Sequence, residues 1–367
     1  MKYKPNCSVK LLSVLGFLLV LSPALPALGQ KQNDLKLKDF RPVSIYKIPQ
    51  TKVEKAKFPV VDFHSHDYPK TDAEVDKWVK TMDEAGIRKS IILSYATGAK
   101  FDAVVQKYAR YKDRFDIWCG FDYTGSDKPG WEKRAVAELE RCYKKGAKGV
   151  GELGDKGLGE LYSQPTPGYG MHIDDPRMRP LLAKCAQLRM PISIHVAEDA
   201  WMYQKPDSTN DGLMNAATWQ VDMTKKGILN HAQLITTLEN AVRDNPKTTF
   251  IACHLANCNA DLNILGGLFD KYINLYADIA ARYGEMAPIP RFVHAFLEKY
   301  SDRIVYGTDM GTAKEMYGTT FRILESADEH FYEHGRFGYH WPLYGLDLTD
   351  ETLKKIYQTN AEKILVR

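Results

Sequence analysis

The chain has 367 residues, of which 44% are hydrophobic and 26% are charged. This composition is typical of a globular protein, and the length suits one large α/β barrel or two ordinary domains. The formal net charge of +4 is small for this length, and no run of Lys or Arg follows one face of the chain. Charge therefore gives no indication of a nucleic-acid partner, and we expect a small-molecule partner instead.

The first residues differ from the rest of the chain. Three lysines precede an apolar run over residues 11–21, and the small residues Ala27 and Gly29 follow a proline-containing stretch. This order is typical of a secretory signal peptide, and the apolar run is short for a membrane span, which needs about 20 residues. We predict a signal peptide over residues 1–29 and an exported protein, periplasmic or secreted, without a stable membrane span after cleavage. The alternative is an uncleaved membrane anchor.

Cysteine usage excludes two classes of protein. One of the six cysteines, Cys7, would leave with the signal peptide, and the remaining five form no Cys-x-x-Cys pair. An odd number without such a pair indicates neither a disulfide framework nor a zinc–thiolate site. Cys119 and Cys253 lie within apolar runs and are expected to be small core residues.

Short apolar runs alternate with amphipathic segments after a polar lead over residues 30–57. The apolar runs have the length and composition of strands, and the segments between them have helical periodicity. The expected strands cover residues 60–64, 90–95, 115–121, 149–153, 192–196, 249–254, 274–279 and 303–307. The expected helices include residues 72–85, 131–145, 178–188, 232–244 and the closing 350–365.

Eight strand–helix units in a chain of this size predict a (β/α)8 TIM barrel over residues 58–367. A doubly wound sheet is the competing fold, but no Gly-x-Gly-x-x-Gly follows the first strand. Three long connections, over residues 152–177, 196–231 and 310–348, leave the carboxyl ends of strands. This is the face on which barrel enzymes carry their sites, and loops of this length are usually functional.

The first expected strand ends in Asp62-Phe63-His64-Ser65-His66. Residues two apart in a strand point to the same face, so His64 and His66 present two imidazoles side by side. Two neutral imidazoles on one strand can bind a transition metal ion, with zinc the first expectation.

Further ionisable residues recur at the same end of other expected strands. Burying several polar groups there without mutual satisfaction would cost roughly a few kcal/mol each, so we expect them to converge on one site. These residues are Glu152, His195, His254 and Asp309.

With these motifs the chain resembles the amidohydrolase superfamily, and within it amidohydrolase family 2. That branch includes aminocarboxymuconate semialdehyde decarboxylase, resorcylate decarboxylases and pyrone-dicarboxylate lactonases. The resemblance covers residues 58–367 and rests on His64-Ser65-His66, His195, His254, Gly307-Thr308-Asp309 and Asn360-Ala361.

The resemblance implies that His64, His66, His195 and Asp309 bind the metal. Such a site leaves a water on the ion, whose pKa falls towards ~7. Asp309 would accept the proton of that water, and His254 would have a catalytic role, either polarising a carbonyl or positioning the water. The cofactor is expected to be one divalent ion, zinc first, with manganese or another transition metal as the alternative.

Glu152 matches the fourth-strand carboxylate that some members of the superfamily use as a ligand, and it is the less certain metal ligand. Binuclear members use a carbamylated lysine there, and no lysine occupies this position, which favours one ion over two. Asp62 would either orient an imidazole or cap the strand.

The loops of the expected catalytic face carry cationic and aromatic residues, which suit a carboxylated ring. Asp278, at the end of the seventh strand, would be structural or line the site. The candidate substrate-binding residues are Arg282, Glu198, Trp201 and Tyr203.

The first functional hypothesis is a metal-dependent hydrolase that uses a metal-activated water on a small carboxylated lactone, ester or amide. The alternative is a metal-dependent non-oxidative decarboxylase or hydratase of the same family. A non-catalytic binding barrel is disfavoured, because such a protein has no need of the full His and Asp set. The sequence leaves open whether the chain forms a homo-oligomer.

Overall fold

The structure is a computed structural model that describes residues 34–213, 220–335, 337 and 340–365. The chain divides into two compact units, Met1–Phe40 and Arg41–Arg367. The first contains a short 3-10 turn, Leu37–Asp39, and the expected signal peptide over residues 1–29 lies outside the described residues. Within the described ranges, no helix is both long and apolar enough to cross a membrane.

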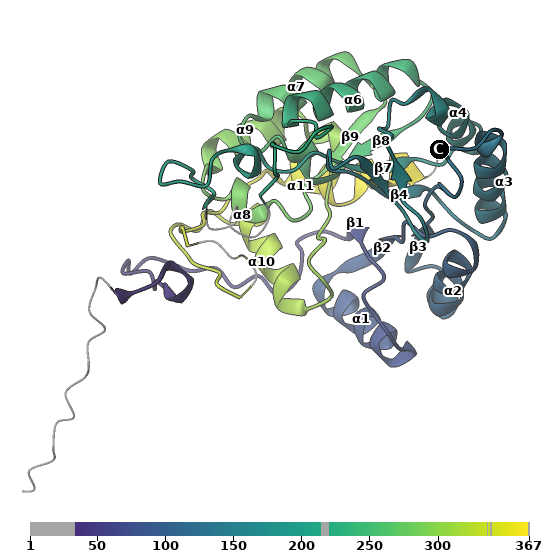
Figure 1. Ribbon diagram of the computed structural model, residues 1–367. Helices are drawn as coiled ribbons and strands as arrows, with labels where there is room; N and C mark the ends of the chain where they lie inside the picture. The colour runs from purple at the N-terminus through teal and green to yellow at the C-terminus, as the bar shows by residue number, and fades with distance from the viewer. Residues whose placement is uncertain (1–33, 214–219, 336, 338–339, 366–367) are drawn as a thin grey trace, which may run out of the picture. The chain divides into compact units, whose positions relative to one another are not determined.

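The second unit is built on eight parallel strands (Figure 1). Strands β1, β2 and β3 pair in that order, and β4, β7, β8, β9 and β10 form a second run. The strands are β1 (Val60–Ser65), β2 (Ile87–Leu93), β3 (Phe115–Trp118), β4 (Val150–Asp155), β7 (Ile192–Val196), β8 (Phe250–Ala252), β9 (Leu275–Asp278) and β10 (Ile304–Val305).

Backbone contacts join the two runs at both seams. Cys119 pairs in parallel with Val150, and the Cys119 N–H donates to the Gly149 carbonyl over 3.0 Å. On the other side, the Phe63 N–H donates to the Tyr306 carbonyl over 2.8 Å. The order β1-β2-β3-β4-β7-β8-β9-β10 therefore returns to β1, and the predicted (β/α)8 barrel is confirmed.

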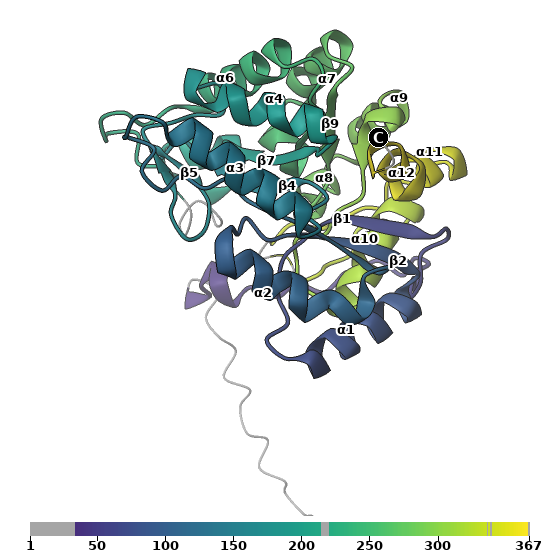
Figure 2. The ribbon, with the colours of Figure 1, turned by 90° about the vertical axis from the view of Figure 1, so that its right-hand side faces the viewer.

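Helices follow the strands and lie outside them, as Figures 1 and 2 show. The helix α1 illustrates the local rules: Thr71 and Glu74 form a capping box, and Gly86 ends the helix at φ 84°. The helices are α1 (Asp72–Ala85), α2 (Gly98–Tyr108), α3 (Trp131–Lys144), α4 (Arg179–Leu188), α6 (His231–Asp244), α7 (Leu262–Lys271), α8 (Tyr283–Met286), α9 (Pro290–Lys299), α10 (Lys314–Glu325), α11 (Asp350–Lys354) and α12 (Asn360–Leu365).

Each of the eight expected strand segments overlaps an observed strand, but two expected connections contain more structure than predicted. A small antiparallel hairpin, β5 (Glu160–Tyr162) and β6 (Gly168–Tyr169), extends the sheet from β4. The helix α10 lies within the expected connection 310–348. The expected closing helix is interrupted by a π-helical turn, Lys355–Thr359.

Apolar side chains fill the barrel interior and the layer between strands and helices. Consecutive residues of β1 divide between the two, because Val61 packs in the interior cluster and Val60 in the outer one. Gly149 lies against the ring of Trp118, where an added Cβ would come within 2.4 Å of ring carbon. Only glycine fits this seam, so the packing of β3 on β4 depends on it.

The lead segment over residues 41–57 contacts the barrel rather than standing apart. Thr51 donates two hydrogen bonds of 2.7 Å to the carboxylate of Asp328, and the Lys57 N–H donates to Glu325.

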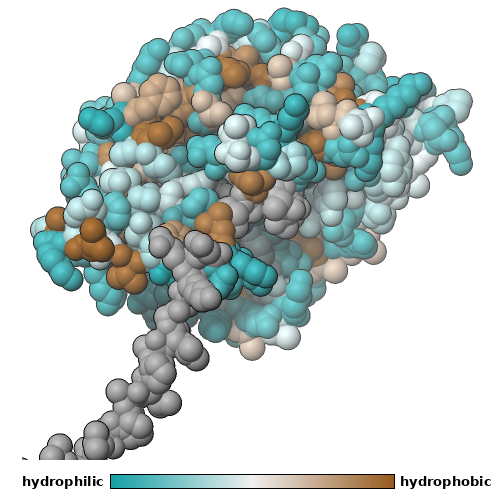
Figure 3. Space-filling view, turned by 60° about the vertical axis from the view of Figure 1, so that its left-hand side comes forward, coloured by the Kyte–Doolittle hydropathy of each residue, from teal (hydrophilic) through white to brown (hydrophobic). Residues whose placement is uncertain are grey.

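The face of the molecule shown in Figure 3 is mostly hydrophilic, with scattered hydrophobic side chains.

Candidate metal centre

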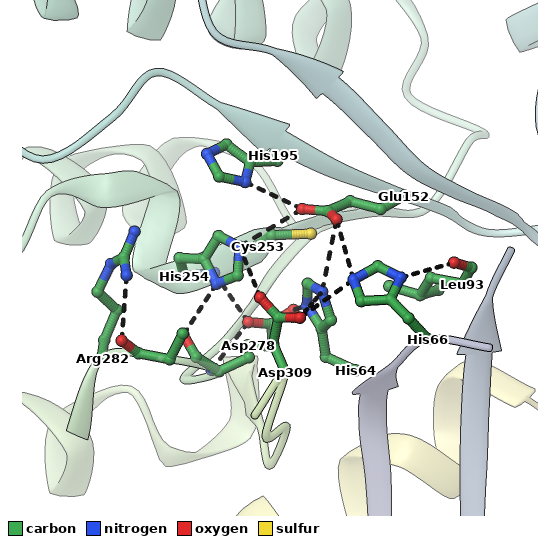
Figure 4. Close-up of polar contacts among 12 residues, drawn as sticks. His64, His66, Leu93, Glu152, His195, Cys253, His254, Asp278, Arg282 and Asp309 are labelled. Carbon is green, nitrogen blue, oxygen red and sulfur yellow. Dashed lines mark hydrogen bonds and ion pairs between the residues drawn. The ribbon is translucent and has the colours of Figure 1, made fainter. Parts of the chain in front are cut away.

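All six residues for which the sequence predicts metal binding or catalysis lie together at the carboxyl ends of the barrel strands (Figure 4). Three of them lie in or directly after strands β1 and β4, in the first half of the barrel. The other three lie in or after strands β7, β8 and β10, in the second half. The six are His64, His66, Glu152, His195, His254 and Asp309.

One carboxylate oxygen of Asp309 faces the two first-strand imidazoles. Asp309 Oδ1 lies 3.1 Å from His66 Nε2 and 3.9 Å from His64 Nε2. Glu152 Oε2 also faces this pair, at 3.4 Å from His66 Nε2 and 3.7 Å from His64 Nε2.

The other oxygen of Glu152 faces the imidazoles of the second half of the barrel. Glu152 Oε1 lies 3.0 Å from His195 Nδ1 and 3.4 Å from His254 Nε2. Glu152 thus stands between two pairs of imidazoles, and the sequence places it there through its position in β4.

Fixed acceptors hold three of the imidazoles through Nδ1. The Nδ1–H of His64 donates to Asp278 Oδ2, that of His66 to the Leu93 carbonyl and that of His254 to the Ala280 carbonyl, each over 2.8 Å. Because Nδ1 carries the proton and donates it to the acceptor, Nε2 of the neutral ring carries the lone pair, and this lone pair points into the cluster.

This donor set fits a divalent cation. Within the described part of the chain, His64 Nε2 is a buried polar atom without a hydrogen-bond partner. Neutral imidazole lone pairs here face the carboxylates of Glu152 and Asp309, an arrangement that repels unless a cation or a proton lies between them. His nitrogens with carboxylate oxygens are ligands of zinc, manganese and related ions.

The carboxylates around the cluster raise the pKa values of the two first-strand imidazoles. Burial alone would lower the pKa of His64, but nearby charges, led by Asp278, raise it well above 6.5. Burial also opposes the shift of His66, whose hydrogen bonds to Asp309 and Glu152 raise its pKa to about 9. The surroundings of His64 and His66 therefore favour a bound proton or cation on their imidazoles.

The carboxylates shift in the opposite direction. Burial would raise the pKa of Glu152 and of Asp309, but the charge of His64 lowers both below their usual range, and His66 adds a hydrogen bond to Asp309. His254 differs, because its burial lowers its pKa. Both carboxylates are thus ionised at neutral pH, and His254 is a neutral base.

Backbone strain is concentrated beside these residues. His254 and Asp309 follow their strands with φ values of 59° and 53°, and residues 254–257 form a left-handed turn without glycine. Non-glycine residues held at positive φ cost of order 1–3 kcal/mol each and collect at functional sites. Asn257 stabilises this turn, since its Nδ2 donates to the carbonyls of Val196 and Ala197 over 3.1 Å.

Asp62 caps the strand rather than orienting an imidazole. Its carboxylate accepts hydrogen bonds from the Thr308 N–H and hydroxyl over 3.0 and 2.8 Å, and from the Ser65 hydroxyl over 3.0 Å. These bonds tie the end of β1 to the loop after β10, which carries Asp309. Asp278 orients His64 instead.

The four candidate substrate-binding residues have different surroundings. Glu198 lies 3.5 Å from His195 Nε2 and pairs with Lys156 over 2.7 Å. Tyr203 accepts a hydrogen bond from the Glu198 N–H over 3.1 Å. Both therefore adjoin the cluster on the side of His195.

Arg282 is buried, and its Nε donates to Asn257 Oδ1 over 3.0 Å while its Nη1 donates to the Ala281 carbonyl. These contacts hold the loops after β8 and β9 together.

Trp201 covers Gly212, where an added Cβ would lie 2.4 Å from the indole ring.

Two side chains that the sequence did not single out contribute to the site. The Tyr68 hydroxyl donates to Asp309 Oδ1 over 3.3 Å. Cys253, expected to be a core residue, is buried, and its sulfur also lies within 4.8 Å of ligand atoms of His64 and Glu152. The one available signal was its position directly before His254 at a strand end.

A cavity of about 750 Å³ opens beside His66. Tyr68 and Tyr95 line it, with ring centroids 5.9 and 5.8 Å from the His66 ring, and Lys100 and Gln164 lie on its wall. His66 and Asp309 are the most exposed members of the cluster, with 19% and 25% of their side chains accessible. A small molecule in the cavity would meet His66, whose Nε2 lies 3.1 Å from Asp309 Oδ1.

Several solved structures share the fold of this chain. A 2,6-dihydroxybenzoate decarboxylase from Rhizobium is 15% identical with a TM-score of 0.52, covering 84% of this chain and 99% of its own. A dihydroxybenzoic acid decarboxylase from Polaromonas, with bound manganese and 2-nitroresorcinol, is 15% identical with a TM-score of 0.52, covering 84% and 97%. A 5-carboxyvanillate decarboxylase from Novosphingobium aromaticivorans, complexed with manganese, is 14% identical with a TM-score of 0.52, covering 87% and 100%.

None of the proteins with curated functions matches the chain. Residues 56–367 match the sequence profile of a family described as amidohydrolase. The match covers the whole barrel and includes every residue of the cluster. The chain therefore belongs to amidohydrolase family 2.

Proposed function

We propose that this protein is a metal-dependent, non-oxidative decarboxylase of a small ring that carries a carboxylate and a neighbouring hydroxyl group. The observation that carries the proposal is the position of Asp309, an ionised and partly exposed carboxylate whose neighbours His66 and Tyr68 line the cavity. The hydrolase expected first from the sequence becomes the second candidate.

The residues that would hold the cation are the cluster imidazoles with Glu152 and Asp309. When bound, a divalent cation supplies electrostatic stabilisation of negative charge on substrate oxygens. We propose manganese or zinc, since both accept nitrogen and carboxylate ligands. The solved structures with manganese support this choice.

Asp309 enters the reaction as a carboxylate, because its pKa lies below the usual range. A group in this state must first accept a proton, and a hydroxyl beside the substrate carboxylate can provide it. Asp309 then returns this proton to the ring carbon that carries the carboxylate. The carbon–carbon bond breaks, its electron pair stays with the ring, carbon dioxide leaves and the product is the phenolate.

Other residues would position the ring. Tyr68 donates a hydrogen bond to Asp309 and lines the cavity together with Tyr95, so two aromatic rings would border a substrate ring bound there. His254 is neutral and lies with Nε2 3.9 Å from Asp309 Oδ2, where it would hold the substrate hydroxyl. Hydroxylated benzoates are the substrates named for structures of this fold, which supports the proposed class.

The test is release of carbon dioxide from defined acids. Protein reconstituted with manganese would be incubated with 2,6-dihydroxybenzoate, 5-carboxyvanillate and benzoate, and product formation followed by chromatography. We expect turnover of at least one hydroxylated acid and none of benzoate, which lacks the hydroxyl proton. Absence of turnover of every hydroxylated acid by metal-loaded, folded protein would count against the proposal.

Hydrolysis of a lactone or ester is the second candidate, and the pair Glu152 and Asp309 favours it. Two ionised carboxylates border the same cluster, so one can accept a proton from water while the other binds the cation. A pH-stat assay with a panel of carboxylated lactones distinguishes this reaction, because hydrolysis releases acid without carbon dioxide.

A further inference from the structure

A short hairpin extends the barrel sheet next to the imidazole cluster. Its first strand, β5, pairs antiparallel with the carboxyl end of β4, where Gly154 lies opposite Tyr162. Glu152 precedes Gly154 by two residues in β4, so the hairpin begins beside the cluster. An added Cβ at Gly154 would come within 2.9 Å of the Tyr162 Cβ, and only glycine permits so close an approach.

One face of this hairpin carries two exposed tyrosines. Glu160 lies opposite Tyr169, and residues two apart in a strand point to one face, so Tyr162 and Tyr169 share a face. Leu161 and Gly168, which pair with each other, are buried on the opposite face. Tyr162 and Tyr169 are 47% and 64% exposed. A single exposed apolar residue is ordinary, but two aromatic rings on one face beside a cavity indicate a binding surface.

Tyr162 continues a row of rings that begins at the cluster. The centroid of the Tyr95 ring lies 5.8 Å from that of His66 and 5.3 Å from that of Tyr162. The rings of Tyr95 and Tyr162 meet edge to face, at 76°. Tyr95 lines the cavity, and so does Gln164, two residues after Tyr162. Tyr162 therefore stands at the edge of the cavity, one ring beyond Tyr95.

Backbone hydrogen bonds fix the position of Tyr95 within this row. Its N–H donates to the Gly151 carbonyl over 2.8 Å, and its carbonyl accepts from the Gln164 N–H over 2.9 Å. Tyr95 is held at φ 42°, a conformation that is costly for residues other than glycine and that collects at functional sites. The row is thus preorganised, which lowers the cost of ordering it around a ligand.

The cavity is larger than a single substituted ring requires. Its volume of about 750 Å³ lies within the range of pockets that hold drug-sized ligands, about 300–1,000 Å³. A hydroxylated acid bound with its carboxylate at His66 would fill only the part of the cavity nearest the cluster. Tyr95 and Tyr162 would then border the remaining space.

We propose that Tyr95 and Tyr162 form a subsite for a second aromatic ring, linked to the ring that loses its carboxylate. Tyr162 is then a specificity-determining residue, because its exposed ring would pack on the second ring of the substrate. Offset or edge-to-face packing of aromatic rings adds to the gain from buried apolar area, which favours an aryl group over an alkyl group of similar size. The inference rests on the proposed function, since it names the substrate class of the same site, and it is tested by binding and not by turnover.

The experiment measures the binding of nitrophenols, in which a nitro group replaces the carboxylate so that no carbon dioxide can leave. Manganese-loaded protein would be titrated by calorimetry with 2-nitrophenol and with its 4-phenyl and 5-phenyl derivatives. We expect one phenyl derivative to bind about 10-fold more tightly than 2-nitrophenol, and the corresponding cyclohexyl derivative to gain less.

Three variants assign this gain to the subsite. Tyr162→Ala should remove most of the difference between the two dissociation constants, whereas Tyr162→Phe keeps the ring and should retain the difference. Tyr143→Ala is the matched control, because Tyr143 is 45% exposed near the end of α3 and lines a different cavity. It should behave as the unaltered protein does.

Equal binding of 2-nitrophenol and both phenyl derivatives to the unaltered protein would overturn the inference, even if a variant failed to fold. So would a gain that Tyr162→Ala retains, or one that the cyclohexyl derivative matches. Carbon dioxide release from single-ring acids together with equal binding would refute the second ring and leave the proposed function standing. A gain that depends on Tyr162, without decarboxylation of any acid with one ring or two, would support the inference and refute the proposed function.

Discussion

Asp309 is partly exposed and faces His66 from the first half of the barrel and His254 from the second, and this position makes it the proposed proton carrier. We expect Asp309→Asn to lower kcat by about 10³-fold or more, since an amide cannot accept and return a proton. The melting temperature should change little. The exposed Asp244, paired with Arg243, gives the control Asp244→Asn, which should keep full activity. Full activity of Asp309→Asn would contradict the assignment.

Asp278 acts through His64 and not on the substrate. It is fully buried, accepts the His64 Nδ1–H over 2.8 Å and so fixes the lone pair that faces the cluster. Loss of such a partner typically costs 10–100-fold in metal affinity. We therefore expect Asp278→Asn to weaken manganese binding by about 10-fold or more, measured by calorimetry. Unchanged affinity would show that His64 needs no such support.

His172 provides a pH-dependent contribution to stability away from the cluster. Its hydrogen bond to Asp155 raises its pKa above 6.5, although burial opposes the shift. The folded state therefore holds this proton more tightly, and the stabilisation is complete below pH 6.5 and is lost as pH rises through the raised pKa. The difference in melting temperature between the protein and His172→Asn should shrink over about pH 6 to pH 9. A constant difference across this range would argue against the pair.

At the scale of elements, the helix α12 is joined to the barrel strands by hydrogen bonds from its first residue. Asn360 is buried at the start of α12 and donates to the carbonyls of Ser301 and Ile304 over 2.6 and 2.7 Å. Asn360→Ala would leave two buried carbonyls unsatisfied, so we expect a loss of roughly 2–3 kcal/mol in urea unfolding. Gln358→Ala, which removes only a bond to Glu362, is the comparison and should cost less. Equal costs would contradict the role of Asn360.

Elements with a strong periodic signal were predictable, and those fixed by tertiary contacts were not. The helix α1 was expected over 72–85 and observed there, because its apolar spacing and its caps agree. The hairpin of β5 and β6 was not expected, since three and two residues carry no periodicity and the pairing with β4 decides their conformation. The helix α10 fell within an expected connection, and its aromatic residues Tyr317 and Phe321 pack in the core.

The same distinction holds for the site. Strand order and strand ends sufficed to predict that His64, His195 and Asp309 converge, because parallel strands bring their carboxyl ends to one face. The choice of Asp278 over Asp62 as the partner of His64 depends on how barrel closure brings the end of β9 close to β1, which no local pattern contains. Tyr68 carried no signal of its own, and the one signal for Cys253 was its position before His254, which is also that of an ordinary core cysteine.

At the scale of the whole molecule, the barrel acts as a frame that brings together distant parts of the chain. Two hundred residues and more separate His64 from Asp278 and Asp309, yet hydrogen bonds join them directly or through Thr308. The strained left-handed residues at the strand ends are tolerated because the closed sheet fixes both sides of each loop. The family, the fold and the donor set agree in pointing to a metal-dependent enzyme.

Diffraction at the manganese absorption edge tests this account most directly, on crystals of the protein grown with MnCl₂. We expect anomalous peaks within about 2.0–2.3 Å of His64 Nε2, His66 Nε2 and an Asp309 oxygen. A saturated crystal with no peak among these residues, or with manganese bound only elsewhere on the molecule, would contradict the account.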